Sequence, residues 1–281
     1  MRTANKSIHI KEIKQYMRKT ARKVWCGGCG NGIVMGALIR AIIDLKIPHQ
    51  KIAIVSGIGC SGRGSAYIDL DSIQTPHGRT IPVATGIKLT RPDMHVVIYS
   101  GDGDLAAIGG NHFIHAARRN IDITTILVNN FIFGMTGGQV TPTTPFGAIA
   151  TTAPYGNIEL PFDLCGLAAA AGATYVARGT TYHVNQLISH IEKAIKNKGF
   201  SFVEVISQCP TQYGKLDKIG TAAQMLLWIK ENTANIGKAG SKTLKESEGK
   251  VIIGEFISRD RPELTESYIQ LNQKVQKEGA N

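Results

Sequence analysis

Short runs of apolar, β-branched residues alternate with longer helical patterns through most of this chain. The strand-like runs are KIAIVSG, HVVIYSG, ITTILVNN, ATYVA and FSFVEVIS. Between them lie segments with apolar residues at helical spacing, such as GNGIVMGALIRAIIDL at residues 30–45. Such alternation is typical of a parallel sheet with helices on both faces. We therefore predict an α/β fold with a doubly wound, mainly parallel sheet.

Glycine-rich and polar loops follow four of the predicted strands. They are GCSG at 59–62, GDGD at 101–104, NNFIFGMTGGQ at 129–139 and QCPTQYG at 208–214. Ligands of open α/β sheets bind outside the carboxyl ends of the strands. We therefore expect the functional residues to lie in these loops.

The two ends of the chain differ in composition from the middle. Residues 1–23 carry eight Lys or Arg and one Glu, which gives +7 of the net charge of +11. We expect a basic arm at 1–24 that is either a solvated helix or a surface for an acidic partner or phosphate-rich ligand. Nucleic acid is the least favoured partner, because no aromatic-rich basic motif follows. Residues 25–230 form the predicted domain, and the polar composition beyond it indicates a linker and C-terminal arm at 231–281.

The composition also excludes some classes of protein. No stretch approaches the roughly 18 to 20 apolar residues that a membrane helix needs, and MRTANKSIHI lacks the apolar core of a secretory signal. We expect a cytoplasmic protein that does not contact a membrane. The five cysteines are an odd number on a long chain, which favours reduced thiols used for metal binding or chemistry.

A magnesium site is predicted where two successive strands end. Asp102 lies in the GDGD loop, and Asn130 follows 28 residues later (130 − 102) at the end of the next strand. Carboxylate and amide oxygens suit Mg²⁺, which completes its shell with carbonyls, waters and phosphates. The glycines around Asp102 let the backbone approach a diphosphate, whose charge the following helix N-terminus stabilises.

Four of the cysteines lie in loops or at helix starts near strand ends, namely Cys26, Cys29, Cys60 and Cys209. Cys165 lies instead inside PFDLCGLAAAAG, where we expect it to pack in the core. Four thiolates could hold a 4Fe-4S cluster or a zinc ion, and the first two could form a disulfide. The cysteine count alone does not separate these alternatives.

Together these motifs resemble a known family. GDG followed by NN is similar to the diphosphate motif of the thiamine diphosphate enzymes. WCGGCGNG, GIGCSGR, HGR, GDGDLAAIGGNHFIHAARRN and NNFIFGMTGGQVTPTTP resemble segments of the β subunit of the 2-oxoacid:ferredoxin oxidoreductases, over residues 25 to about 213. One departure is Gly27, where that family commonly has Pro. The resemblance implies a diphosphate-domain type of fold with thiamine diphosphate, Mg²⁺ and one 4Fe-4S cluster as cofactors.

The resemblance also implies roles for individual residues. Mg²⁺ would be bound by Asp102, Asn130 and the carbonyl of Ile132, and the cluster by Cys26, Cys29, Cys60 and Cys209. The residues expected to contact the organic cofactor are Ile58, Gly59, Cys60, Ser61, His77, Gly103, Asp104, Gly134, Met135 and Thr136. Arg63 and His77 are the expected catalytic residues, Arg63 as a bidentate partner for the substrate carboxylate.

The implied activity is oxidative decarboxylation of a 2-oxo acid to acyl-CoA and CO₂, with electrons passed through the cluster to ferredoxin. GIGCSGR and GNHFIHAARRNIDIT are most similar to the 2-oxoglutarate branch, and pyruvate or a broad range of 2-oxo acids is the alternative. An α subunit would supply an activating glutamate and much of the coenzyme A site. Two other classes remain as rivals: a non-redox thiamine enzyme, which has no use for four cysteines, and a zinc-binding module, which has no use for GDG and NN.

Overall fold

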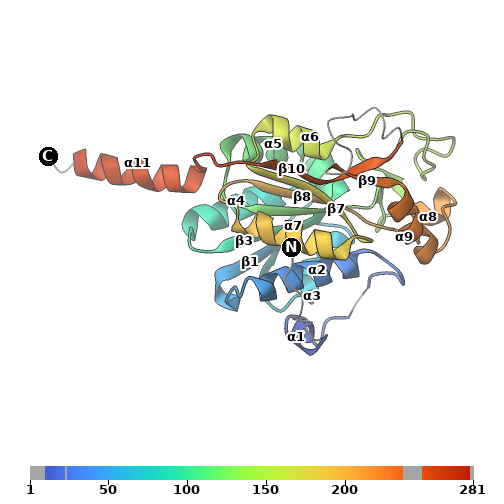
Figure 1. Cartoon of the computed structure of the whole chain (residues 1–281), viewed down its shortest axis with the longest axis horizontal. Coiled ribbons are helices and arrows are strands. Elements are labelled where there is room, and N and C mark those ends of the chain that lie inside the picture. Colours follow the sequence, from blue (N-terminus) through green and yellow to red (C-terminus); the bar gives the residue numbers. More distant parts are fainter. Residues whose placement is uncertain (1–9, 23, 237–248, 279–281) are drawn as a thin grey trace.

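The core of the protein is a twisted sheet with helices on both faces (Figure 1). The computed structural model describes residues 10–22, 24–236 and 249–278. Within them the main sheet has eight strands in the order β2-β1-β3-β4-β8-β7-β10-β9. Their bounds are β1 Ile52–Ser56, β2 Asp71–Gln74, β3 His95–Gly101, β4 Thr124–Asn129, β7 Tyr175–Thr180, β8 Ser201–Ile206, β9 Thr233–Asn235 and β10 Val251–Ser258. All neighbouring pairs are parallel except β7 with β10, so the predicted doubly wound, mainly parallel fold is confirmed.

Alternating residues of the buried strands supply two separate cores. Ile52 and Ile54 of β1 pack on the face covered by α2 (Asn31–Asp44) and α7 (Val184–Lys196). Ala53 and Val55 point to the opposite face, which is covered by α4 (Thr80–Thr90), α5 (Gly110–Arg119) and α6 (Leu164–Ala171). Both faces of the sheet are apolar because helices cover both. This burial explains why the parallel strands appear in the sequence as continuous apolar runs.

The remaining elements are short or lie at the margins of the sheet. They are α1 Ile10–Gln15, η1 His49–Lys51, η2 Ser61–Arg63, α3 Gly64–Tyr67, the π-helical turn η3 Gly103–Ile108, the two-stranded sheet β5 Ile132–Phe133 with β6 Gln139–Val140, α8 Tyr213–Leu216, α9 Ala222–Glu231 and α11 Leu264–Glu278. None of the helices in the described part combines the length and the apolarity that crossing a membrane requires.

The C-terminal part differs from the linker and arm that we expected at 231–281. β10 pairs with β7 in antiparallel register and β9 pairs with β10, so both are part of the main sheet. The apolar residues of VIIGEFI explain the difference, because Ile253 is buried and Phe256 packs on the α6 face of the core. α11 projects from the body as an arm (Figure 1). Residues 237–248 lie outside the described part.

The N-terminal segment packs on the domain over the residues that are described. The backbone N–H of Arg18 donates to Tyr67 O at 2.9 Å, and the N–H of Asp69 donates to Tyr16 O at 2.7 Å. Ile13 and Met17 contact the core beneath α2. Residues 1–9 and 23, which carry part of the expected basic arm, are outside the described residues.

Candidate active site

A cavity of about 150 Å³ opens at the carboxyl ends of β1, β3 and β4. These strands are neighbours in the sheet. β2 lies on one side of β1, whereas β3 and β4 lie on the other side, so the order in which strands are added reverses between β1 and β3. Open α/β sheets bind their ligands at such a point. The cavity is lined by Ile58, Gly59, Cys60, Ser61, His77, Gly101, Asp102, Gly103, Asp104, Asn130, Ile132, Phe133, Gly134, Met135 and Thr136. All the residues that we expected to bind the organic cofactor or Mg²⁺ are in this lining.

Three oxygen atoms converge on one side of the cavity. The amide oxygen of Asn130 lies 3.2 Å from Asp102 Oδ1 and 2.9 Å from the carbonyl oxygen of Ile132. Neighbouring oxygens around Mg²⁺, with bonds of about 2.1 Å at right angles, lie about 3 Å apart, so both distances are compatible with adjacent ligands in an octahedral shell. In the rotated orientation of the Asn130 amide, its NH₂ group donates hydrogen bonds to Asp102 Oδ1 and to Ile132 O. The three groups are then hydrogen-bonded to one another without a cation.

The second oxygen of Asp102 is held by two hydroxyl groups. Thr141 Oγ1 and Thr143 Oγ1 each lie 2.7 Å from Asp102 Oδ2. Burial raises the pKa of Asp102 to about 6, although the hydrogen bonds from the two threonine hydroxyls act to lower it. The threonines therefore fix the carboxylate so that Oδ1 faces Asn130 and Ile132.

Asp104, two residues later, has a different environment. Its Oδ1 accepts hydrogen bonds from the backbone N–H groups of Gly78, at 2.8 Å, and Ile58, at 3.2 Å, and lies 2.7 Å from His77 Nδ1. Its Oδ2 accepts from Ser100 Oγ at 2.8 Å. Both oxygens are thus engaged by the protein, and Asp104 orients the loops that carry Ile58 and His77.

A π-helical turn brings these aspartates into place. The segment after Asp102 forms η3 followed by α5 and not one continuous α-helix. The N–H of Gly109 donates to Asp104 O, five residues earlier, at 3.0 Å. Such π turns are rare and often occur at functional sites. Gly103 is required here because a Cβ atom would lie 2.2 Å from the ring of Phe133.

The four thiols of the loop cysteines gather next to the cavity. Cys60 lines it, and a Cβ atom on Gly134 would lie 3.6 Å from Cys60 Sγ and 3.5 Å from Cys209 Sγ. Burial, together with the nearby Cys29, Cys209 and Cys26, raises the pKa of Cys60 to about 12. Such electrostatic coupling requires the thiols to lie near one another. The structure thus brings the four expected cysteines together.

Local hydrogen bonds shape this group of thiols. The N–H of Cys29 donates to Cys26 O at 3.1 Å and closes the Cys26–Cys29 turn. Trp25 Nε1 donates to Cys60 O at 2.7 Å, which ties the turn to the loop after β1. Asn31 Nδ2 lies 3.4 Å from Cys29 Sγ.

Cys165 lies apart from this group, inside α6. It is buried, and its Sγ donates to Glu204 Oε2 at 3.4 Å. Burial raises the pKa of this thiol well above its usual range, with Glu204 adding to the shift. The residue therefore remains a protonated thiol in the core.

Arg63 is the expected catalytic residue that does not line the cavity. It lies at the end of η2, directly after Ser61 and the buried Gly62. Its Nε is buried and has no hydrogen-bond partner among the described residues.

Several site residues were not predicted from the sequence. They are Ser100, Asn129, Phe133, Thr141 and Thr143. The two threonines belong to the TPTTP segment, which carried part of the family resemblance. Their separation of about 40 residues from Asp102 gave no signal that the hydroxyls would contact that carboxylate.

Comparisons with known proteins agree with this site. Residues 57–205 match the family described as thiamine pyrophosphate enzyme, C-terminal TPP binding domain. The class of protein is therefore a thiamine diphosphate-binding domain, and thiamine diphosphate is its cofactor.

Relatives define the class further. The chain is 54% identical over 265 residues to the 2-oxoglutarate synthase subunit KorB of Methanocaldococcus jannaschii, covering 94% of this chain and 98% of the relative. It is 51% identical over 254 residues to that subunit of Methanothermobacter thermautotrophicus, covering 90% and 89%. The solved 2-oxoglutarate:ferredoxin oxidoreductase from Magnetococcus marinus, with 2-oxoglutarate, coenzyme A and succinyl-CoA bound, matches with a TM-score of 0.85 and 33% identity over 94% of this chain and 91% of that chain. The chain belongs to the β subunits of the 2-oxoacid:ferredoxin oxidoreductases, in the 2-oxoglutarate synthase branch.

Proposed function

We propose that this β subunit oxidatively decarboxylates 2-oxoglutarate to succinyl-CoA and CO₂ and passes the electrons through an iron–sulfur cluster to ferredoxin. The observation that carries the proposal is that the residues expected to bind Mg²⁺ and the expected cluster cysteines adjoin at one cavity. Asp102, Asn130 and Ile132 converge on one side of the cavity, and Cys60 lines the same cavity together with Gly134. The proposed metal–diphosphate site and the group of four thiols would thus adjoin, as a reaction with electron transfer requires.

Asp102, Asn130 and the carbonyl of Ile132 would hold Mg²⁺ against the diphosphate. Gly103 and Asp104 line the cavity at the start of η3, and the N-terminus of this turn would stabilise the negative charge of the diphosphate. Thiamine diphosphate supplies, when bound, the carbon nucleophile that attacks the 2-oxo group and allows CO₂ to leave.

His77 and the apolar residues of the cavity would serve the reacting end of the cofactor. His77 Nδ1 is engaged by Asp104, so Nε2 remains to accept or donate a proton in the cavity. Ile58 and Met135 line the cavity and are half-exposed, so they can exclude water once a ligand and a partner cover them. Arg63 remains a proposed partner for the carboxylate of the 2-oxo acid, because its Nε has no protein acceptor in the described part.

Cys26, Cys29, Cys60 and Cys209 would hold one 4Fe-4S cluster. Among the described residues, no three His, Cys, Asp or Glu side chains lie close enough together to share one metal ion. A four-iron cluster uses one thiolate for each iron, so its ligands surround a larger volume than those of a zinc ion. The cluster would lie behind Gly134, directly beside the cofactor cavity.

The choice of substrate rests on the relatives, which are named as 2-oxoglutarate synthase subunits. Pyruvate is the alternative substrate. The proposal includes an α subunit, which would contribute the activating glutamate and much of the coenzyme A site, and ferredoxin as the acceptor, in the cytoplasm.

The test is anaerobic purification of the chain with its partner subunit, followed by assays of 2-oxo-acid-dependent reduction of a viologen dye. We expect a brown protein with about four irons per chain, and higher kcat/KM for 2-oxoglutarate than for pyruvate when coenzyme A is present. A colourless protein would contradict the cluster, whereas a preference for pyruvate would contradict the substrate alone.

A further inference from the structure

A buried ion pair lies in the middle of the main sheet, outside the cavity described above. Arg178 of β7 and Glu204 of β8 are directly opposite in the parallel register, and Arg178 Nε donates to Glu204 Oε2 at 2.6 Å. The two side chains are 12% and 3% exposed. Replacing such a buried pair with apolar residues is often neutral or stabilising, so stability alone does not explain it.

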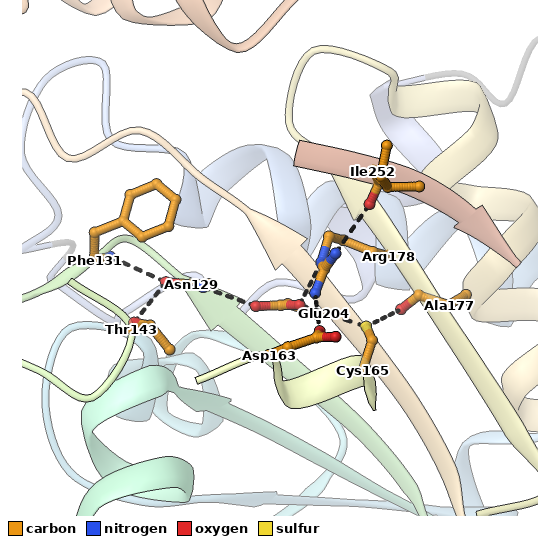
Figure 2. Close-up of polar contacts among 9 residues, drawn as sticks. All are labelled: Asn129, Phe131, Thr143, Asp163, Cys165, Ala177, Arg178, Glu204 and Ile252. Atoms are coloured by element: carbon orange, nitrogen blue, oxygen red, sulfur yellow. Dashed lines mark hydrogen bonds and ion pairs between the residues drawn. The ribbon is translucent and has the colours of Figure 1, made fainter. Parts of the chain in front are cut away.

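Contacts from three elements fix the Arg178 guanidinium (Figure 2). Besides Glu204, it donates to Asp163 Oδ1 at the start of α6, at 2.7 Å, and to Ile252 O of β10, at 3.0 Å. Because every contact restrains the plane of the guanidinium, the position of Glu204 Oε2 is restrained as well.

The other oxygen of Glu204 points toward the end of β4. Glu204 Oε1 accepts a hydrogen bond from Asn129 Nδ2 at 2.8 Å. This bond determines which way the Asn129 amide faces, because the NH₂ group must point to the carboxylate. Asn129 Oδ1 consequently points to the opposite side, into the turn that carries Asn130.

Asn129 Oδ1 holds that turn. It accepts from the N–H of Phe131 at 3.1 Å, and Thr143 Oγ1 lies 3.0 Å away. Phe131 has φ of +66°, a left-handed conformation that is uncommon for a bulky residue and needs such support. The turn places Asn130 and Ile132, while the same Thr143 hydroxyl contacts Asp102 Oδ2 at 2.7 Å.

We propose that Glu204 and Arg178 are positioning residues for the magnesium and diphosphate site, acting through the amide of Asn129. They touch neither metal nor cofactor. Their contacts instead orient Asn129, which holds the Asn130 turn and adjoins Thr143 (Figure 2). The inference rests on the magnesium site proposed above and extends it to residues of two further strands.

The test measures Mg²⁺-dependent binding of thiamine diphosphate by calorimetry, using the whole oxidoreductase stripped of this cofactor. In Glu204→Gln the single amide oxygen can accept a hydrogen bond from Arg178 or from Asn129 but not from both. We expect the dissociation constant to rise about tenfold or more, as is typical when outer partners of metal ligands are lost. Asp163→Asn is the matched control, because it removes a carboxylate from the same guanidinium but leaves the Glu204–Asn129 bond, and its affinity should stay within about twofold of the unsubstituted protein.

Two double variants separate positioning from a general effect on folding. Asn129→Asp with Glu204→Gln exchanges the donor and the acceptor of the hydrogen bond between residues 129 and 204. This variant should bind thiamine diphosphate more tightly than Glu204→Gln alone. Arg178→Met with Glu204→Met replaces the buried ion pair with apolar side chains, so the melting temperature should be unchanged. Binding of thiamine diphosphate should nevertheless remain weaker than in the unsubstituted protein.

Unchanged affinity in Glu204→Gln, or an equal loss in Asp163→Asn, would overturn the positioning role. So would a reversed double variant that binds no better than Glu204→Gln, or a methionine pair that binds as the unsubstituted protein does. Binding to the unsubstituted complex without any dependence on Mg²⁺ would instead overturn the proposed metal site, and this inference with it.

Discussion

At the scale of single residues, two aspartates in one loop have opposite tasks. Asp102 keeps Oδ1 directed at Asn130 and Ile132 because two threonine hydroxyls occupy its Oδ2. Asp104 has both oxygens engaged by protein donors. The first carboxylate can therefore serve a metal, whereas the second holds the surrounding loops in place.

The cysteines provide the first prediction. Cys165→Ala should leave the iron content of the purified protein unchanged, because this thiol is buried in α6 away from the other four. Cys60→Ala should lose or degrade the cluster, since Cys60 lies against the cavity beside Gly134. Iron assays and visible absorption under anaerobic conditions measure both. Equal iron content in the two variants would refute this division of the cysteines.

His190 provides a prediction about pH and stability. Its Nε2 is buried and has no partner within the described part of the chain, and burial lowers the pKa of the imidazole to about 4. The unfolded chain therefore binds the proton more strongly between about pH 4 and 6.5, so stability falls as the pH drops through this window and is unaffected above it. Between pH 7.5 and 5 we expect His190 to cost about 2 kcal/mol of the free energy of unfolding.

Urea unfolding at the two pH values, compared between the protein and His190→Gln, isolates this contribution. The variant should lose less stability on acidification, because other titrating groups are common to both proteins. Parallel losses would show that His190 is not responsible.

At the scale of elements, the strand ends and the turns after them determine the site. β3 and β4 are adjacent and parallel, with Gly101 opposite Val128, so the loops that follow them meet at one edge of the sheet. The spacing of Asp102 and Asn130 was sufficient to predict this meeting. The π turn of η3 was not predicted, because its six residues are too few for a change of helical period to be visible in the pattern of apolar residues.

The turn at Gly103 gives an element-scale prediction. In Gly103→Ala the new methyl group would meet the Phe133 ring, which must then move and so change the wall of the cavity. We expect a stability loss of about 1–3 kcal/mol and weaker binding of thiamine diphosphate. Gly110→Ala is the control, because a Cβ atom there meets nothing within 4 Å. Calorimetric titration and thermal melting measure both effects, and equal affinity in the two variants would count against the close approach at Gly103.

The limits of sequence reasoning also follow from the elements. Apolar periodicity predicted every long strand of the parallel sheet, since both faces of each strand are buried. It failed for β10, because a polar segment precedes this strand and suggested a linker. The Arg178–Glu204 pair could not be predicted either: a charged residue in a strand reads as a solvent-facing position, and only the register of β7 with β8 shows that the two charges meet.

At the scale of the whole molecule, the protein exposes apolar side chains around and beyond its active site. Tyr155, Ile158 and Leu160 are 100%, 85% and 82% exposed in the loop between β6 and α6. α11 projects from the body, and Tyr268, Leu271 and Val275 lie exposed along it at spacings of three and four residues (Figure 1). Contiguous exposed apolar surface is typical of protein interfaces, which agrees with a subunit of a multi-subunit oxidoreductase.

The last prediction concerns activity without a partner. Thiamine enzymes need a carboxylate against the aminopyrimidine ring. In the described part of the chain, the acids that line the cavity are Asp102 and Asp104, and both have other tasks. Glu204 is committed to Arg178 and Asn129, and Glu159 lies exposed in a loop outside the cavity lining. We therefore expect the activating glutamate to come from a partner subunit, across an obligate interface of more than about 2,000 Å².

We expect the purified chain alone to bind thiamine diphosphate but to show no turnover with 2-oxoglutarate, Mg²⁺ and coenzyme A, and the co-expressed complex to reduce the dye. Removing residues 264–281 should leave the melting temperature of the isolated chain almost unchanged, because Thr265 is the one buried residue of α11 among those described. The same truncation should reduce recovery of the partner on affinity purification if α11 contributes to the interface. Sustained turnover by the isolated chain would overturn the requirement for a second subunit, since it would show that a carboxylate of this chain reaches the cofactor.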